Sequence, residues 1–191
     1  MLPVQVQLVL PDWVHAAIDP ARDYPGDAGK VAVAIDLSRH NIEARTGGPF
    51  GAAVFGPDDR LVAAGVNVVL PQHASVAHAE IMAFMLAQQC LQRPRFNELA
   101  DGSHVGPYTL ATSAQPCCQC FGASIWAGID RLLIGARAED VEALTEFDEG
   151  PLPDDWIGEL GSRGIEVVRD LHRDAARAVL AEYGAQGGKR Y

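Results

Sequence analysis

Residues 78–80 read His-Ala-Glu and residues 116–120 read Pro-Cys-Cys-Gln-Cys, and these two stretches decide what kind of protein the chain is. His78, Cys117 and Cys120 supply three zinc-type ligands, and no further Cys or His stands at a ligand-like spacing from them. A structural zinc ion is usually held by four protein ligands, whereas a catalytic one keeps a position open for water. The sequence therefore predicts a catalytic zinc site, with one Zn²⁺ per chain and a water molecule as the fourth ligand.

The spacing of these residues predicts that they lie at the starts of two helices. Cys117 and Cys120 are three residues apart, so their thiols share one face if Pro116 opens a helix. His78 begins an apolar stretch, residues 79–87, that reads as a mostly buried helix. Glu80 is two residues from His78 and so points in another direction, which suits a carboxylate that moves the protons of the bound water.

Two other interpretations of the cysteines are weaker. A structural zinc knuckle would use Cys117 and Cys120 but lacks a fourth ligand and leaves Glu80 without a role. A disulfide within residues 117–120 is disfavoured because the chain reads as an intracellular protein. Cys118 is an alternative ligand to Cys117, but the spacing favours Cys117 and predicts that Cys118 only packs.

Composition and charge indicate a globular enzyme rather than a nucleic-acid or membrane protein. The 191 residues are 48% hydrophobic, enough for a sizeable core, and we expect a single domain over residues 1–191. Its core is expected at about residues 27–170, with a C-terminal helix and tail at 171–191. The formal net charge of −10 disfavours a nucleic-acid partner. The apolar start, residues 1–11, lacks a basic region and is too short to span a membrane, which predicts a cytoplasmic location and no membrane partner.

Predicted helices and strands alternate along the chain, which is typical of an α/β fold. A helix is expected from Asp27, as its N-cap, to about residue 44, and further helices at 138–144 and 171–183. The predicted strands are residues 50–55, 61–66, 108–112, 131–135 and 165–168. The polar stretch 92–106 reads as a loop or a partly helical insertion. Together these elements predict a central mixed five-stranded sheet between helices.

Several motifs resemble those of the cytidine-deaminase-like superfamily, closest to its branch of bacterial guanine deaminases and tRNA adenosine deaminases. They are Gly-Gly-Pro-Phe-Gly-Ala at 47–52, Asn67, His78–Ala83, Thr112-Ser113, Pro116-Cys117 with Cys120, and Trp126–Arg131. In this superfamily the glutamate of the H-x-E…P-C-x-x-C signature moves protons and does not bind zinc. The resemblance covers residues 27–150 and implies a three-layer fold and a homodimer.

The resemblance also assigns roles to residues. It implies zinc ligation by His78, Cys117 and Cys120, and proton transfer by Glu80. It further implies a substrate contact from Asn67 and a contact from the backbone around Ala79 and Cys117.

The chain departs from the family pattern at one position and offers further candidates elsewhere. The family often has an acidic residue before its Pro-Cys, where this chain has Gln115. Guanine deaminases have a second carboxylate in the region that matches residues 146–149, so Asp148 is predicted as catalytic, with Glu146 as the alternative. A solvated acidic turn is an equally good interpretation of these residues.

Aromatic residues are needed to hold a heterocyclic substrate as well. Phe50 is a candidate for the substrate-pocket wall, or else a core residue, and Trp156 is a candidate to close over the site. Related guanine deaminases use an aromatic C-terminal tail as a lid, but for residues 189–191 we expect a frayed terminus instead.

Three classes of function follow. The leading one is zinc-dependent hydrolytic deamination of a free nucleobase or similar aminated heterocycle, with guanine as the first substrate to consider. A cytosine-like pyrimidine or a triazine is the alternative, since Gln115 and residues 92–106 are able to reshape the pocket. Editing of adenosine in tRNA is disfavoured by the acidic charge, and a non-catalytic zinc-stabilised binding protein is disfavoured by Glu80.

Overall fold

The computed structural model describes residues 2, 4–19, 21–24 and 26–190, and its centre is a single five-stranded sheet. The strands are β1 (Gly51–Phe55), β2 (Leu61–Val66), β3 (Thr109–Ala114), β4 (Arg131–Ala136) and β5 (Glu166–Val168), in the order β2-β1-β3-β4-β5. Strand β1 runs antiparallel to β2 and β3, whereas β3, β4 and β5 are parallel to one another. The predicted mixed five-stranded sheet is therefore confirmed.

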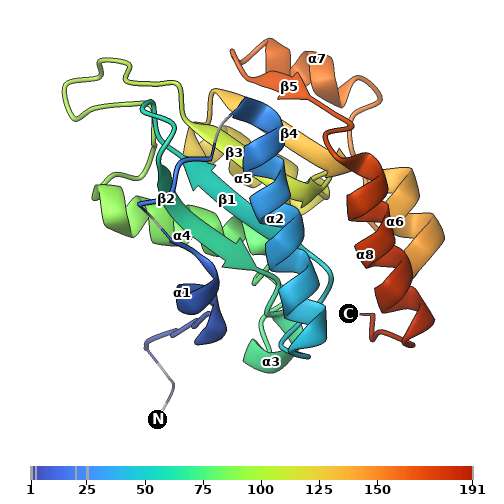
Figure 1. Ribbon diagram of the computed structural model, residues 1–191. Coiled ribbons are helices and arrows are strands. Elements are labelled where there is room, and N and C mark those ends of the chain that lie inside the picture. The colour runs from blue at the N-terminus through green and yellow to red at the C-terminus, as the bar shows by residue number, and fades with distance from the viewer. Residues whose placement is uncertain (1, 3, 20, 25, 191) are drawn as a thin grey trace.

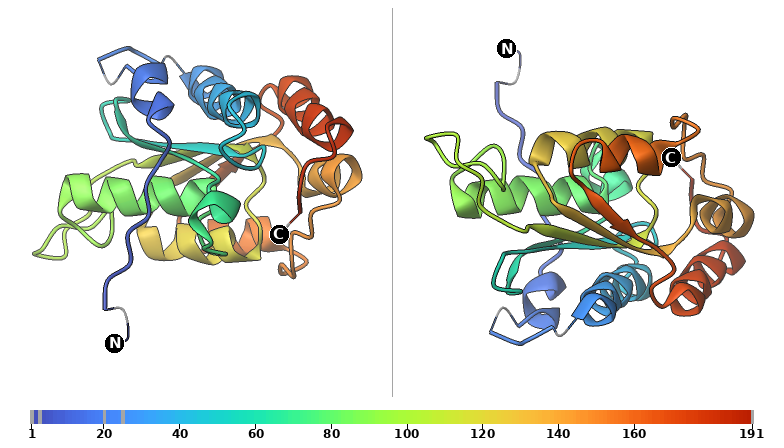
Figure 2. Two further views of the ribbon diagram at one scale, coloured as in Figure 1. Left: turned by 90° about the horizontal axis from the view of Figure 1, so that it is seen from below. Right: turned by 90° about the horizontal axis from the view of Figure 1, so that it is seen from above.

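Helices cover both faces of this sheet, which gives three layers (Figures 1 and 2). The helices are α1 (Trp13–Ala17), α2 (Gly26–Glu43), α3 (Val69–Gln72), α4 (Ala79–Leu91), α5 (Cys118–Ala127), α6 (Ala138–Thr145), α7 (Trp156–Gly161) and α8 (Arg173–Ala185). Helices α2 and α8 pack on one face and helices α4 and α5 on the other (Figure 2). None of the helices in the described part of the chain is long and apolar enough to cross a membrane.

Strand β1 shows how the sequence fills both layers of core. Successive side chains of a strand point to opposite faces of the sheet. Ala53 and Phe55 lie in the core beneath α2 and α8, while Ala52 and Val54 lie in the core beneath α4 and α5. All five residues of β1 are buried, so this strand reads as a continuous apolar run rather than an alternating one.

The first predicted helix differs from the observed one at its start. Helix α2 begins at Gly26, so Asp27 lies inside the first turn and does not cap the helix from outside. Its carboxylate instead accepts two hydrogen bonds from Arg131 at the start of β4, at 2.8 and 2.9 Å. Bidentate pairs of this kind are strong and directional, so Asp27 fixes α2 to the sheet.

The stretch between α4 and β3 is a loop, held by one carboxylate. Asp130 accepts hydrogen bonds from Asn97 Nδ2 at 2.8 Å and from the Tyr108 backbone N–H at 2.7 Å, and it contacts His104 Nε2 at 2.9 Å. The loop leaves the C-terminal end of α4. A helix of 13 residues is about 20 Å long, so the loop is about 20 Å from His78 at the other end.

Candidate active site

Three zinc-type ligands meet where α4 and α5 begin. The ligand atoms of His78, Cys117 and Cys120 all lie within 4.8 Å of one another. His78 Nδ1 is 3.5 Å from Cys117 Sγ and 3.6 Å from Cys120 Sγ. Tetrahedral zinc with ordinary Zn–S and Zn–N bonds separates its sulfur and nitrogen ligands by about 3.6 Å. The three side chains therefore fit a zinc ion without rearrangement.

The local backbone explains how residues 39 positions apart in sequence reach one point. His78 and Cys117 each occupy the N-cap of a helix, with extended backbone, and Cys120 lies in the first turn of α5. The positive end of the helix dipole therefore faces the ligands from both helices, together with first-turn backbone N–H groups that have no partner within their helix. Ala79 is the first residue of α4, so its backbone N–H belongs to this set.

The electrostatics of the site favour a bound cation. A hydrogen bond from Cys120, and then one from His78, hold the pKa of Cys117 down to about 4 against the opposing effect of burial. The hydrogen bond to Cys117, together with burial, raises the pKa of Cys120. Burial lowers the pKa of His78, but its contact with Cys117 and the charges of Glu80 and Cys117 outweigh this and raise it. A buried thiolate needs a positive partner, and a bound metal cation supplies one.

Glu80 lies beside the ligands as the sequence predicts for a proton carrier. The residue is only 7% exposed, and burial, followed by the charge of Cys117, raises the pKa of its carboxyl to about 7. A general acid–base group works best when its pKa is near the working pH. Glu80 is thus suited to accept and return a proton at neutral pH.

A cavity of about 290 Å³ opens onto these residues. Its size is at the lower end of the range for small-molecule sites, roughly 300–1,000 Å³. The residues that line it are Phe50, Asn67, Val69, Ser75, His78, Glu80, Gln115, Cys117, Cys118, Gln119, Phe147, Asp148, Glu149 and Gly150. The zinc-type ligands and Glu80 therefore share one small pocket with Asn67 and Phe50.

Glu149 is a site residue that the sequence reasoning missed. It is 8% exposed, and burial, followed by the charges of Cys117 and Glu80, raises the pKa of its carboxyl to about 9. Asp148 also lines the pocket, but its side chain is exposed and accepts a hydrogen bond from the Gly150 N–H at 2.8 Å. Glu146 is exposed and pairs with Arg190 at 2.7 Å, and it does not line the pocket.

Only a weak signal for Glu149 was present in the sequence. Residues 146–149 form no helix or strand, so no regular period predicts which of their side chains are buried. In the structure Phe147 and Glu149 are buried, while Glu146 and Asp148 are exposed. The apolar Phe147 marks the stretch as partly buried, but the choice among the three carboxylates depends on packing.

Asn67, which lines the pocket, carries an unused hydrogen-bond donor. The residue is 1% exposed, and its Oδ1 accepts a hydrogen bond from the Val69 N–H at 3.3 Å. Among the described residues, none provides a hydrogen-bond partner for its Nδ2 group. A buried donor without a partner costs free energy, which a ligand acceptor in the pocket recovers. Phe50 supplies an aromatic wall nearby, with its ring 5.4 Å from that of Phe147.

Comparison with known proteins agrees with this geometry. Residues 27–136, more than half of the chain, match the family model described as the cytidine and deoxycytidylate deaminase zinc-binding region. The chain belongs to this deaminase family. The resemblance predicted from the motifs is confirmed, and so are the cytidine-deaminase-like fold and the assignment as a zinc hydrolase of the nucleobase-deaminase type.

Several of the similar proteins are guanine deaminases. The guanine deaminase of Bacillus subtilis is 31% identical over 116 residues, which are 61% of this chain and 67% of that protein. A solved guanine deaminase from Nitrosomonas europaea is 43% identical, with a TM-score of 0.87 over 97% of this chain and 99% of the other. Another crystal structure holds a single-residue variant protein in complex with 8-azaguanine. The chain in it is 44% identical in sequence to this one, with a TM-score of 0.87 over 95% of this chain and 98% of that one.

Some predicted contacts of the deaminase site lie elsewhere. Trp156 begins α7 and packs partly buried against the core beneath α4 and α5, and it is not among the described residues that line the pocket. Gln115 does line the pocket and is 7% exposed. No described residue of the loop at 92–106 lines the pocket, so the prediction that this loop reshapes it is wrong.

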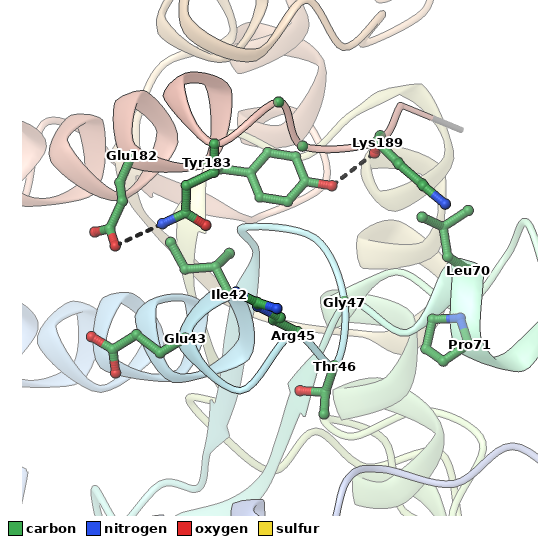
Figure 3. Close-up of a pocket in the computed structure, with 13 residues that line it drawn as sticks. Ile42, Glu43, Arg45, Thr46, Gly47, Leu70, Pro71, Glu182, Tyr183 and Lys189 are labelled. Atoms are coloured by element: carbon green, nitrogen blue, oxygen red, sulfur yellow. Dashed lines mark hydrogen bonds between the residues drawn. The ribbon is translucent and has the colours of Figure 1, made fainter.

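The C-terminal tail of this deaminase is packed rather than frayed. Tyr183 donates a hydrogen bond to the Lys189 carbonyl at 2.7 Å, and Gly188 lies so close to the Tyr183 ring that a Cβ there would clash. The tail borders a second cavity of about 1,130 Å³, between the end of α2, α3 and α8 (Figure 3). The expectation of a frayed terminus is therefore wrong for the described residues 184–190, and Tyr191 lies outside them.

Proposed function

We propose that this protein is a guanine deaminase, which uses water to replace the amino group of free guanine by oxygen and releases ammonia. The observation that carries the proposal is the pocket itself: Asn67, whose Nδ2 group has no partner among the described residues, and the buried Glu149 line the same small cavity as the zinc-type ligands. Guanine has a ring carbonyl that accepts from an amide donor and an N–H edge that donates to a carboxyl oxygen. The similarity to guanine deaminases supports this choice.

The substrate is held by three contacts. Asn67 donates to the ring carbonyl, Glu149 lies on the ring's N–H and amino edge, and Phe50 packs against the ring face. A site built to hydrogen-bond a substrate discriminates strongly against analogues that leave its buried groups unpaired. Asn67 and Glu149 therefore set the choice of base.

Glu80 carries the protons of the reaction. Zinc bound by His78, Cys117 and Cys120 would supply Lewis acidity that makes water easier to deprotonate at neutral pH. Glu80 accepts the proton of the attacking water and returns it to the ring nitrogen next to the reacting carbon. The second proton of the water, now on the hydroxyl of the reacting carbon, passes to the departing amine; the C–N bond then breaks, the carbonyl forms and ammonia leaves. Its raised pKa lets Glu149 carry a proton at neutral pH, so it is able to assist this last transfer.

The test is ammonia release by zinc-loaded protein against guanine, cytosine, aminated triazines, adenine and the corresponding nucleosides. We expect turnover of guanine and little of the others. Turnover of a pyrimidine or triazine but not of guanine would reject guanine as the substrate and keep the deaminase chemistry. If no compound of the panel releases ammonia while zinc is bound, the protein is not a free-base deaminase, and a polymeric substrate or a binding role has to be tested instead.

Metal content and assembly complete the proposal. We expect one zinc per chain, measured by atomic emission on the purified protein. We also propose a homodimer through the face formed by α4 and α5, because apolar side chains are exposed there: Trp126 at 76% and Leu86 at 36%. Light scattering should give the mass of a dimer. Trp126→Glu places a charge on this face and should convert the dimer to a monomer. An unchanged mass would place the interface elsewhere.

A further inference from the structure

A directional chain of hydrogen bonds leads from α1 to the substrate-binding Asn67. Trp13 Nε1 donates to Thr46 Oγ1 at 2.9 Å, and Thr46 Oγ1 donates to Asn41 Oδ1 at 2.7 Å. Asn41 Nδ2 then donates to two backbone carbonyls, that of Gly48 at 2.8 Å and that of Asn67 at 2.9 Å. This series of hydrogen bonds begins at Trp13, which lies 14 residues before the segment that matches the deaminase family model.

The direction of every bond in this chain is fixed. An indole N–H only donates, so the Thr46 hydroxyl accepts from Trp13 and its own proton is free for Asn41. The Asn41 oxygen takes that proton, at 2.7 Å against 3.4 Å for the competing Asn41 carbonyl. The Asn41 amide nitrogen therefore faces the two carbonyls. The two carbonyls only accept, so they favour this orientation too, and the Thr46 hydroxyl adds to it by fixing the position of the Asn41 oxygen from the other side.

The surroundings are shaped for this arrangement. Asn41 is fully buried, so each of its hydrogen bonds matters. A Cβ on Gly47 would lie 1.8 Å from the Asn67 carbonyl oxygen and 2.7 Å from Asn41 Nδ2. Only glycine lets the loop approach closely enough for one amide to bind both carbonyls. Figure 3 shows Thr46 and Gly47 in this loop, across the second cavity from Tyr183.

The two carbonyls lie beside the pocket's own contacts. Gly48 precedes Phe50 by two residues, and the Asn67 N–H donates to the Phe50 carbonyl at 3.1 Å. Both Phe50 and Asn67 line the pocket. The Asn41 amide thus ties together the two backbone segments that present the aromatic wall and the free amide donor.

We propose that Asn41, held by Thr46 and Trp13, is a positioning residue that sets where the Asn67 amide stands in the pocket. The inference rests on the proposed function, in which Asn67 contacts the substrate. It assigns a role in substrate binding to α1, which lies outside the matched family segment and has no residue in the pocket.

The test replaces Thr46 by valine, which keeps the shape and removes the hydroxyl, and by serine, which keeps the hydroxyl. We expect Thr46→Val to raise KM for guanine about three- to tenfold, the usual effect of a lost neutral hydrogen bond, with little change in kcat. Thr46→Ser should restore KM. Trp13→Phe should act in the same direction and more weakly, because it removes the indole N–H and keeps an aromatic ring.

A double-mutant cycle separates positioning from general stability. In an Asn67→Ala background the amide is absent, so Thr46→Val should have no further effect on KM. Equal KM effects in both backgrounds, or a lower Tm with unchanged KM, would overturn the proposal.

A readout without guanine keeps the test independent of the proposed function. Amide hydrogen exchange of residues 66–70 should be faster in Thr46→Val than in Thr46→Ser. If the wild-type protein does not turn over guanine, the proposed function is wrong, and the exchange rates alone then test the positioning role. Equal exchange rates in the two variants would reject it.

Discussion

Replacement of Glu149 by glutamine should stabilise the zinc-free protein, and increasingly so as the pH rises. Its carboxyl has a pKa of about 9 in the fold, chiefly because of burial, against an ordinary value of 4.5. When the pKa of a carboxyl is higher in the folded protein than in the unfolded chain, the group makes its full contribution to stability only below its pKa in the unfolded chain. This contribution is lost as the pH rises toward the pKa in the folded protein. Glutamine has the same shape and no charge, so it avoids the loss.

The size of the effect follows from this pKa shift. Each pH unit between the two pKa values is worth about 1.4 kcal/mol for one proton. At pH 7, about 2.5 units above the unfolded value, holding Glu149 protonated in the fold costs about 3 kcal/mol. The free energy of unfolding of Glu149→Gln should therefore exceed that of the wild type by about 3 kcal/mol at pH 7, and by less than 1 kcal/mol at pH 5.

Urea denaturation of chelator-treated, reduced protein at pH 5, 6, 7 and 8 measures this difference. Asp148→Asn is the matched control, since it removes one carboxylate from the neighbouring exposed position; it should change the pH dependence much less than Glu149→Gln, because the Asp148 charge is a minor contribution to the raised pKa of Glu149. With zinc bound the Glu149→Gln difference should shrink, because a cation nearby favours the carboxylate. Parallel curves for wild type and Glu149→Gln would refute the reasoning from burial.

Three further predictions concern catalysis and the metal. Glu80→Ala should keep its zinc and its fold while kcat for ammonia release falls at least about a hundredfold, as expected for a lost proton carrier; wild-type rates would remove the mechanism. Glu149→Gln should lower kcat strongly while Asp148→Asn changes it little, and the reverse ranking would restore Asp148 as the second catalytic carboxylate. Removal of zinc by a chelator should abolish turnover and lower Tm, and both should return on addition of Zn²⁺.

The sequence predicted the long elements well because their signals are strong. The Leu61–Val66 strand was predicted with its observed bounds, and the other predicted strands lie within two residues of the observed ends. Three short helices were not predicted: α1, α3 and α7 have only four to six residues, too few for a helical period to show. Asp27 carried a cap signal, yet its carboxylate is used by Arg131, which is distant in sequence.

The site was predictable where fixed spacing encodes the chemistry. The ligand set and Glu80 follow from two short motifs, and the structure brings them to one point. Trp156 and Glu149 show the limit of this reasoning. Both stand in stretches without a regular period, so their side-chain directions depend on packing against the rest of the fold. Trp156 packs in the core, whereas Glu149 turns into the pocket.

The anchored loop after α4 offers a practical use. Its tip, residues 98–103, is exposed, includes Gly102 with a positive φ, and stands at the far end of α4 from the zinc-type ligands. Exposed tips of this kind tolerate inserted sequence, while Asp130 holds the loop's base in place. A peptide tag or a fluorescent reporter inserted between Asp101 and Gly102 should therefore allow immobilisation or imaging of the enzyme without disturbing its catalytic end.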